Sequence, residues 1–326
     1  MRILLSSDHQ YPSFREVGVG RRPMPMPSGS GQHIHDLIAK GLAELGHEVL
    51  YWLPKGTDRP LPPGVTLVTE PVREADILHT TTYQDKERVA YMTAQGKPWV
   101  STCHLDLNGR GQERIPITDH CIFVSRTLAR SHGSNRYVLN GIDPSEFIYA
   151  ETKEAYFLFI SSLEHAMDKG LETAFSLSQE TGIELVVAGT GQQDERIQAM
   201  IRLCKKHQAT YVGDIRGQAK ARLFSQAKAV LLPTRVNEAF GLVLVEALIS
   251  GTPVICSDQG ACPEIISSEV GFVCRNPAEY REAVDRLETI SPGACREKAL
   301  REFHYLRMAA DYVKEYEIEI ARVSAG

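Results

Sequence analysis

The chain has 326 residues, a formal net charge of −5, 43% hydrophobic residues and 24% charged residues, which is the composition of an ordinary globular protein. Its length exceeds what one hydrophobic core comfortably serves, so we expect two domains of about 150 residues each. The charge balance argues against nucleic-acid binding. No apolar run approaches the ~18 residues of a membrane-spanning helix, and Met1 to Asp8 turns acidic too early for a signal peptide, so a cytoplasmic location is expected.

Short apolar or β-branched runs alternate with helix-period segments along the chain, which predicts an α/β fold with parallel sheets and helices on both faces. One set of strands is predicted at 3–6, 49–53, 77–79, 99–102 and 121–124. A second set is predicted at 157–160, 185–188, 230–232, 254–256 and 272–274. The polar segment 151–155 separates the sets, so we expect an N-terminal domain of residues 1–150 and a second domain from residue 151.

The first predicted strand is followed by an unusually long loop, from about His9 to Gly31. Its prolines and glycines exclude a helix or a central strand, and connections of this length are usually functional or disordered. Two interpretations stay open, a lid that covers an acceptor or a merely mobile loop. After it, apolar residues on one stripe predict a helix from Ile34 to Leu45 that ends at Gly46.

The seven cysteines are scattered along the chain, and no C-x-x-C pair occurs. This spacing fits neither a zinc site nor a disulfide framework. We expect the cysteines to act as small buried hydrophobic residues.

Two glutamates separated by seven residues, Glu238 and Glu246, are the most informative feature. If a helix begins near Gly241, Glu238 lies in the preceding loop and Glu246 lies about one turn into the helix. The backbone N–H groups of Phe240, Gly241 and Leu242 would then offer a phosphate site at the positive end of the helix dipole. Carboxylates on both sides of a phosphate suit hydroxyl groups, so the pattern predicts a nucleotide-sugar ligand.

The segment 229–258 around this motif resembles the family 4 retaining glycosyltransferases. Further similarities are Asn140-Gly-Ile-Asp143, Gly260-Ala-Cys-Pro-Glu264 and the segment 303–317. The resemblance implies the GT-B fold, in which two Rossmann-like domains face a central cleft. It also implies that residues 151–304 bind the nucleotide-sugar donor, and that a C-terminal helix at about 305–326 packs back on the acceptor-side domain 1–150.

The resemblance also implies roles for individual residues. Lys169 would neutralise the leaving diphosphate, and His104 would lie near the reacting carbon of the sugar. Glu238 would bind hydroxyls of the transferred sugar, and Glu246 would bind the ribose. Gly29 and Gly31 match the family's glycine-rich turn near the diphosphate, although Ile34 stands where a dinucleotide fingerprint would have its third glycine.

One motif departs from the family. Where the family has Gly-Arg-Leu, this chain has Ser161-Ser162-Leu163, so Ser162 stands in place of a donor-binding arginine. Arg235, three positions before Glu238, and His165 are the candidate replacements.

The resemblance implies a retaining transfer from a nucleotide-diphosphate sugar, a substrate rather than a cofactor, to the hydroxyl of a small acceptor. No Asp-x-Asp pattern of metal-ligand type follows a donor-domain strand, so we expect a reaction without metal. Two alternatives stay open. The protein is a non-catalytic nucleotide-sugar binding protein, or it is another GT-B enzyme such as an epimerase. Turnover of a sugar donor separates the binding protein from the transferase.

Overall fold

The computed structural model describes residues 1–13, 30–57, 59–70, 74–80, 86–105, 118–191 and 193–324. The chain divides into two compact units, of which unit 1 is Met1–Ile142 with Phe303–Gly326 and unit 2 is Asp143–Glu302. The sequence-based boundary lay at residue 150. Residues 143–150 group with unit 2 because the short 3₁₀ helix η1 (Pro144–Glu146) packs against that unit's α6, and the ring of Tyr149 lies against Gly251.

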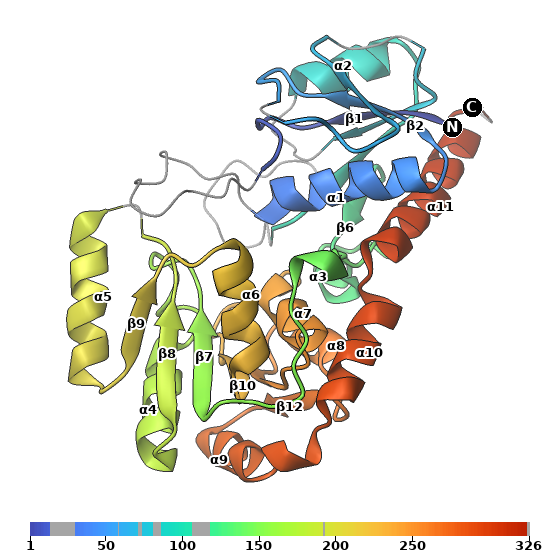
Figure 1. The fold of residues 1–326 in the computed structure, drawn as a ribbon. Helices are drawn as coiled ribbons and strands as arrows, with labels where there is room; N and C mark the ends of the chain where they lie inside the picture. The colour runs from blue at the N-terminus through green and yellow to red at the C-terminus, as the bar shows by residue number, and fades with distance from the viewer. Residues whose placement is uncertain are drawn as a thin grey trace. The chain divides into compact units, whose positions relative to one another are not determined.

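Unit 1 contains a parallel six-stranded sheet in the order β3-β2-β1-β4-β5-β6 (Figure 1). Its strands are β1 Arg2–Ser6, β2 Glu48–Trp52, β3 Val65–Val68, β4 Ile77–Thr80, β5 Trp99–Cys103 and β6 Cys121–Phe123. Its helices are α1 Ser30–Glu44, α2 Lys86–Ala94, α3 Arg126–Ser131 and α11 Tyr305–Ser324. Helices α1 and α11 lie on one face of the sheet and α2 lies on the other. The sequence did not predict β3, an edge strand that is only partly buried.

The last helix, α11, packs against α1 within unit 1. The helices approach closely at Gly41, where an added Cβ would lie 2.7 Å from the Cβ of Ala309. Tyr312 and Tyr316 on α11 are fully buried, and the Tyr305 hydroxyl donates to Glu44 at 2.8 Å. The C-terminal segment is therefore part of the unit 1 core.

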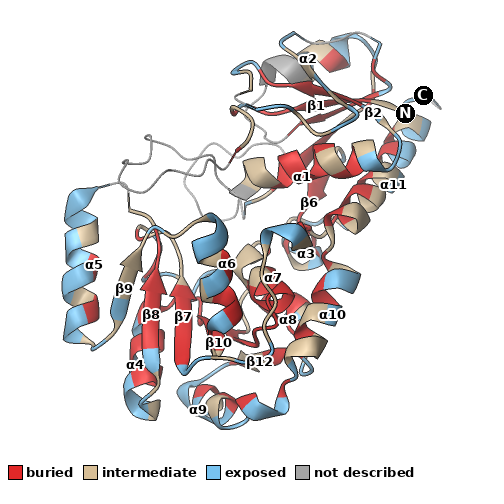
Figure 2. Ribbon diagram, viewed as in Figure 1, coloured by how far each residue is buried: buried red, intermediate tan, exposed pale blue. Residues whose placement is uncertain are grey.

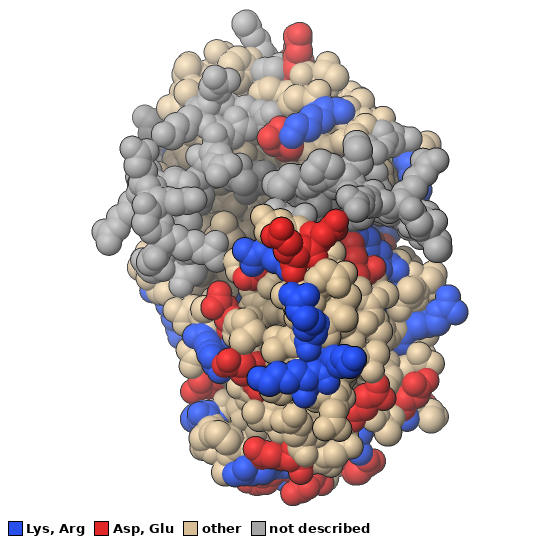
Figure 3. Space-filling model, turned by 90° about the vertical axis from the view of Figure 1, so that its left-hand side faces the viewer, with Lys and Arg blue, Asp and Glu red and all other residues tan. Residues whose placement is uncertain are grey.

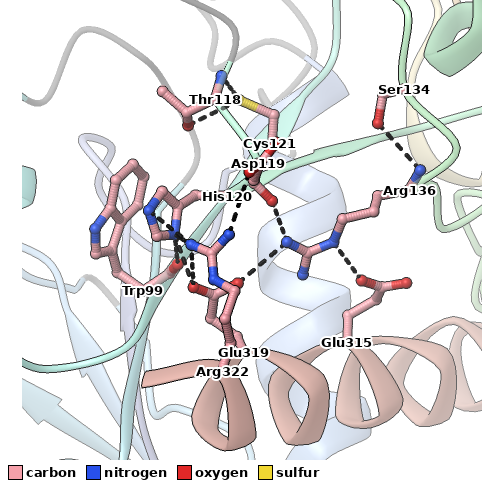
Figure 4. A network of polar contacts seen from close by, with 10 residues as sticks. All are labelled: Trp99, Thr118, Asp119, His120, Cys121, Ser134, Arg136, Glu315, Glu319 and Arg322. Atoms are coloured by element: carbon pink, nitrogen blue, oxygen red, sulfur yellow. Dashed lines mark hydrogen bonds and ion pairs between the residues drawn. The ribbon is translucent and has the colours of Figure 1, made fainter. Parts of the chain in front are cut away.

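A charged network joins the end of α11 to the sheet edge at β6 (Figure 4). Its centre is Glu319, whose side chain is 0% exposed, with Nδ1 of His120 at 2.8 Å from Oε1 and Nη1 of Arg136 at 3.1 Å from Oε2. Arg136 also donates to Glu315 at 2.8 Å, and Arg322 lies 3.0 Å from Glu319. The opposed charges compensate the burial of the Glu319 carboxylate.

Unit 2 contains a second parallel six-stranded sheet, in the order β12-β11-β10-β7-β8-β9. Its strands are β7 Tyr156–Ile160, β8 Glu184–Ala188, β9 Thr210–Gly213, β10 Ala229–Leu232, β11 Val254–Ser257 and β12 Gly271–Cys274. Its helices are α4 Leu171–Thr181, α5 Asp194–Lys206, α6 Gly217–Gln226, α7 Leu242–Ile249, α8 Cys262–Ile265, α9 Pro277–Asp285, η2 Leu287–Thr289 and α10 Pro292–Glu302. The sequence did not predict β9, another partly exposed edge strand.

The inner strands of unit 2 are buried except for one end residue each of β7 and β8, as Figure 2 shows for these two strands. A cluster around Phe157, Phe159 and Phe175 forms a core of this unit. All seven cysteines are free and buried, as the sequence predicted. In the part of the chain that the structure describes, no helix is long and apolar enough to cross a membrane.

Charges of both signs are interspersed on the face of unit 2 that carries α5 (Figure 3). Helix α5 has Asp194 and Glu195 in its first turn and Lys205 and Lys206 in its last turn. This order stabilises a helix because it opposes the helix dipole at both ends.

Candidate active site

Loops at the carboxyl ends of the unit 2 strands are held together by close backbone contacts. If Gly170, after β7, carried a side chain, its Cβ would lie only 1.9 Å from the carbonyl oxygen of Pro233, after β10. A Cβ on Gly260, after β11, would lie 2.2 Å from the backbone nitrogen of Glu238. Both positions have positive φ and require glycine. These contacts fix the segment that carries Glu238, at the sheet edge where ligands bind in open α/β folds.

Lys169 and Glu238 meet at this edge. Nζ of Lys169 lies 2.5 Å from Oε2 of Glu238, with the two side chains 23% and 13% exposed. The lysine precedes α4, and the glutamate precedes α7. Two residues that the sequence assigned to one site are thus brought into direct contact.

Helix α7 begins at Leu242, and Gly241 is its N-terminal cap with φ of 88°. A Cβ on Gly241 would lie 2.9 Å from Leu244 and 3.2 Å from Cγ of Glu238, so the turn also leaves no room for a side chain. Phe240, just before this turn, is buried. The predicted start of the helix is confirmed, and Glu246 lies in its second turn.

Glu246 is held by a residue that the sequence did not single out. Nζ of Lys220, on α6, donates to Oε1 of Glu246 at 2.7 Å. The glutamate side chain is 13% exposed and that of the lysine is 29% exposed. Lysine in a helix is so common that its position in the sequence carries no signal. The contact depends on how α6 packs against α7.

The candidate replacements for the missing arginine have other partners. Nη2 of Arg235 donates to Glu172 on α4 at 2.7 Å, and both side chains are more than half exposed. His165 lies 3.9 Å from Asp168 and is also exposed. Ser162 contributes its backbone carbonyl to a turn, accepting from the His165 amide at 3.1 Å.

In unit 1, His104 follows β5 immediately. Burial lowers the pKa of its imidazole to about 4, so the ring is neutral at pH 7. Nε2 is shielded from solvent and has no hydrogen-bond partner among the described residues. A Cβ on Gly31, at the start of α1, would lie 3.2 Å from this ring. Gly31 and His104 are thus neighbours, whereas Gly29 and most of the predicted lid lie outside the described residues.

Two further histidines lie next to His104. His35 on α1 is fully buried, with its ring centroid 4.8 Å from that of His79 and 6.1 Å from that of His104. Burial lowers the pKa of His79 to about 3 and holds the pKa of His35 well below its usual value. His79 contacts the Tyr316 hydroxyl at 2.7 Å and the Thr102 hydroxyl at 2.7 Å. This cluster could not be predicted from the sequence, because His35 lies on α1, His79 lies on β4 and His104 follows β5.

No group of three or more His, Cys, Asp or Glu side chains that could hold a metal ion occurs among the residues for which the structure gives positions. Two lysine–glutamate pairs, Lys169–Glu238 and Lys220–Glu246, lie at the unit 2 site.

The family model described as "Glycosyl transferases group 1" matches residues 143–302, the whole of unit 2. Unit 2 therefore has the sequence pattern of the group 1 glycosyltransferases. Lys169, Lys220, Glu238 and Glu246 all lie within the matched residues.

Curated relatives of this chain include proteins named as glycosyltransferases. An uncharacterised glycosyltransferase, MJ1607, of Methanocaldococcus jannaschii is 29% identical over 175 residues, 47% of this chain and 44% of the relative. The phosphatidyl-myo-inositol mannosyltransferase of Mycobacterium tuberculosis is 24% identical over 280 residues, 78% of this chain and 68% of the relative. The matches span less than half the length of the first curated relatives, between 41% and 46%.

Solved structures of glycosyltransferases have the same fold. AviGT4, a glycosyltransferase involved in avilamycin A biosynthesis, superimposes with a TM-score of 0.75 at 23% identity, covering 98% of both chains. Anabaena Alr3699/HepE in complex with UDP superimposes with a TM-score of 0.73 at 14% identity, covering 97% of this chain and 100% of the other. This chain therefore has the two-domain, Rossmann-like GT-B fold that the resemblance implied.

Proposed function

We propose that this protein transfers a sugar from a nucleoside-diphosphate sugar to a hydroxyl group of a small acceptor, with retention of anomeric configuration. The observation that carries the proposal is the pair of carboxylates beside the start of α7, Glu238 and Glu246, each bonded to a lysine within the segment that matches the family. Similar structures with UDP and with UDP-glucose, both of Anabaena Alr3699/HepE, support a donor of this class.

We propose one orientation for the donor in this site. The diphosphate would lie against the first turn of α7, where the helix dipole stabilises negative charge. Glu238 in the preceding loop would accept hydrogen bonds from the transferred sugar, and Glu246 on the helix would accept them from the ribose. Lys169 would supply the positive charge that a leaving diphosphate needs.

On the acceptor side, His104 is the proposed catalytic residue of unit 1. Its lowered pKa keeps the imidazole neutral, so the ring can donate or accept a hydrogen bond at a sugar hydroxyl without adding a positive charge. The unpartnered Nε2 is suited to such a polar ligand, because a buried nitrogen without a partner is costly. Gly31 is proposed to leave room beside this ring.

We further propose that the reaction requires neither a metal nor a cofactor, since Lys169 and the start of α7 supply the charge stabilisation that a divalent cation gives in other transferases. The seven free cysteines favour a reducing compartment such as the cytoplasm.

The test measures turnover rather than binding alone. The protein is incubated with UDP-, GDP- and ADP-sugars and a panel of hydroxyl acceptors, and release of nucleoside diphosphate is followed together with the anomeric proton of the product by NMR. We expect acceptor-dependent release and a product with the configuration of the donor. An inverted product would reject retention, and tight diphosphate binding without release would favour a binding protein.

A further inference from the structure

The second glutamate of the motif is fixed by a contact from a neighbouring helix. Lys220 lies in the first turn of α6, and its ammonium donates to Oε1 of Glu246 on α7 at 2.7 Å. A carboxylate can accept about four hydrogen bonds over its two oxygens, so this contact leaves Oε2 able to accept from a ligand. The lysine therefore sets the direction of the carboxylate without consuming its capacity.

Lys220 is itself held in place. Its Nζ atom lies 5.6 Å from the ring centroid of Phe224, one turn further along α6, and Phe224 is fully buried. An ammonium over an aromatic face is attracted by the ring quadrupole. The lysine side chain thus has two anchors, an aromatic ring on its own helix and the Glu246 carboxylate on the next.

The pair is poorly suited to a purely stabilising role. A partly buried lysine–glutamate pair adds little net folding stability, because the lost hydration of the two charges offsets much of their attraction. The same arrangement nevertheless occurs at Glu238, which Lys169 holds from a different loop. Each carboxylate of the motif is thus oriented by a lysine from outside its own segment.

We propose that Lys220 is a positioning residue that orients Glu246 toward the ribose hydroxyls of the donor, and that it sets the preference for ribonucleotides over nucleotides lacking those hydroxyls. The inference rests on the proposed function, because it takes Glu246 to be the ribose ligand. Without the lysine, the glutamate can adopt several rotamers, and ordering it would oppose ligand binding.

The experiment compares the affinities of matched nucleotides by titration calorimetry. The probes are UDP, GDP and ADP and the 2′,3′-dideoxy form of whichever binds most tightly. In the unmodified protein we expect removal of the hydroxyls to weaken binding about tenfold or more, as for hydrogen bonds to a charged group. We call this loss of affinity the dideoxy penalty, or simply the penalty. In Lys220→Met and in Lys220→Gln the penalty should fall to about threefold or less, and Lys220→Arg should restore most of it.

A matched control and a double variant isolate the role of the lysine. Lys228 is also paired with a glutamate in unit 2, with Nζ 3.2 Å from Glu288 and a side-chain exposure of 31%. Lys228→Met should leave the penalty unchanged. Glu246→Ala should abolish the penalty, and adding Lys220→Met to it should change nothing further. Melting temperatures close to that of the unmodified protein would exclude a general loss of structure.

The outcomes separate this inference from the proposed function. If the unmodified protein bound no nucleoside diphosphate, the proposed function would be wrong and the inference with it. If it discriminated through Glu246 but Lys220→Met kept the full penalty, only the positioning role would be overturned. Tighter ribonucleotide binding by Lys220→Met would also overturn it, since the lysine would then compete with the ribose.

Discussion

Nζ of Lys169 lies 2.5 Å from Oε2 of Glu238. The residue proposed to bind the diphosphate is therefore bonded to the residue proposed to bind the transferred sugar. The segments that carry them meet through Gly170, which leaves no space for a side chain beside Pro233. A diphosphate that reaches Lys169 must share the ammonium with this carboxylate. Binding of the leaving group and orientation of the sugar-binding glutamate are therefore expected to be coupled.

Removing the lysine should impair the chemical step. In Lys169→Met we expect turnover to fall about 100- to 1,000-fold, the usual effect of losing one electrostatic contact to developing charge. The measurement is the initial rate of nucleoside diphosphate release at saturating donor. Lys205→Met, at the exposed end of α5, is the control and should keep the original rate. Equal rates in both variants would remove Lys169 from the mechanism.

The two glutamates should have separable roles. Glu246→Ala should weaken nucleoside diphosphate binding about 10- to 100-fold, because a hydrogen bond to a charged group is lost. Glu238→Ala should change this affinity by no more than about threefold but should lower turnover at least 100-fold. Titration with the nucleoside diphosphate and a rate assay with the sugar donor distinguish the two effects. A similar loss of affinity in both variants would contradict the assignment of one glutamate to ribose and the other to sugar.

The start of α7 could be predicted from the sequence because it depends on local chemistry. Gly241 has a positive φ that few other residues adopt, and the apolar residues of α7 follow it directly. The pairing of Lys220 with Glu246 could not be predicted, since the two residues are 26 positions apart in sequence and their contact depends on the packing of α6 against α7. The spacing of the two glutamates predicts a role for Glu246 but carries no information on Lys220.

The same distinction applies to the fold. The buried inner strands were predicted because they form continuous apolar runs, whereas β3 and β9 were missed because each is a sheet edge whose residues are partly exposed. The unit boundary was placed too late along the chain, at a polar break in the sequence. The contact of Tyr149 with Gly251, which joins residues 143–150 to unit 2, is a tertiary interaction.

The missing arginine leads to a paired prediction. Arg235 extends from the loop before Glu238 and donates to Glu172, an exposed pair that adds little stability and can be exchanged for a phosphate. If Arg235 partly replaces the arginine, Arg235→Ala should lower turnover about tenfold or more, and Glu172→Gln should not. Ser162→Arg should then raise turnover only slightly. If Ser162→Arg raised turnover tenfold while Arg235→Ala kept the rate of the unmodified protein, the protein would instead be a weakened transferase.

Chelation tests the proposed independence from metal. Since Lys169 and the helix dipole of α7 are expected to stabilise the leaving group, EDTA should change the initial rate by less than about twofold, or less than ~0.5 kcal/mol of barrier. The measurement is donor turnover before and after treatment, with manganese or magnesium added back. Loss of activity that either cation restores would mean that a metal participates.

The network around Glu319 should make unit 1 sensitive to acid (Figure 4). Burial alone would raise the pKa of this carboxyl, but contacts from His120 and Arg136 and the charge of Arg322 outweigh burial and lower it. A carboxyl with a lowered folded-state pKa stabilises the protein above its unfolded pKa of about 4.3, and this contribution is lost as the pH falls through the folded value.

Glu319→Gln should therefore destabilise the protein by about 1–3 kcal/mol at pH 7, because the guanidinium groups of Arg136 and Arg322 lose the negative charge that they face. The difference from the unmodified protein should shrink as the pH falls from the unfolded pKa of about 4.3 through the lowered folded-state pKa, below which both proteins carry a neutral side chain. Denaturant unfolding between pH 3 and pH 8 measures both effects. Glu317→Gln, an exposed position two residues earlier on α11, is the control and should change stability by less than about 0.5 kcal/mol. A deficit for Glu319→Gln that did not vary with pH would mean that the loss comes from packing rather than from the charge of the carboxylate.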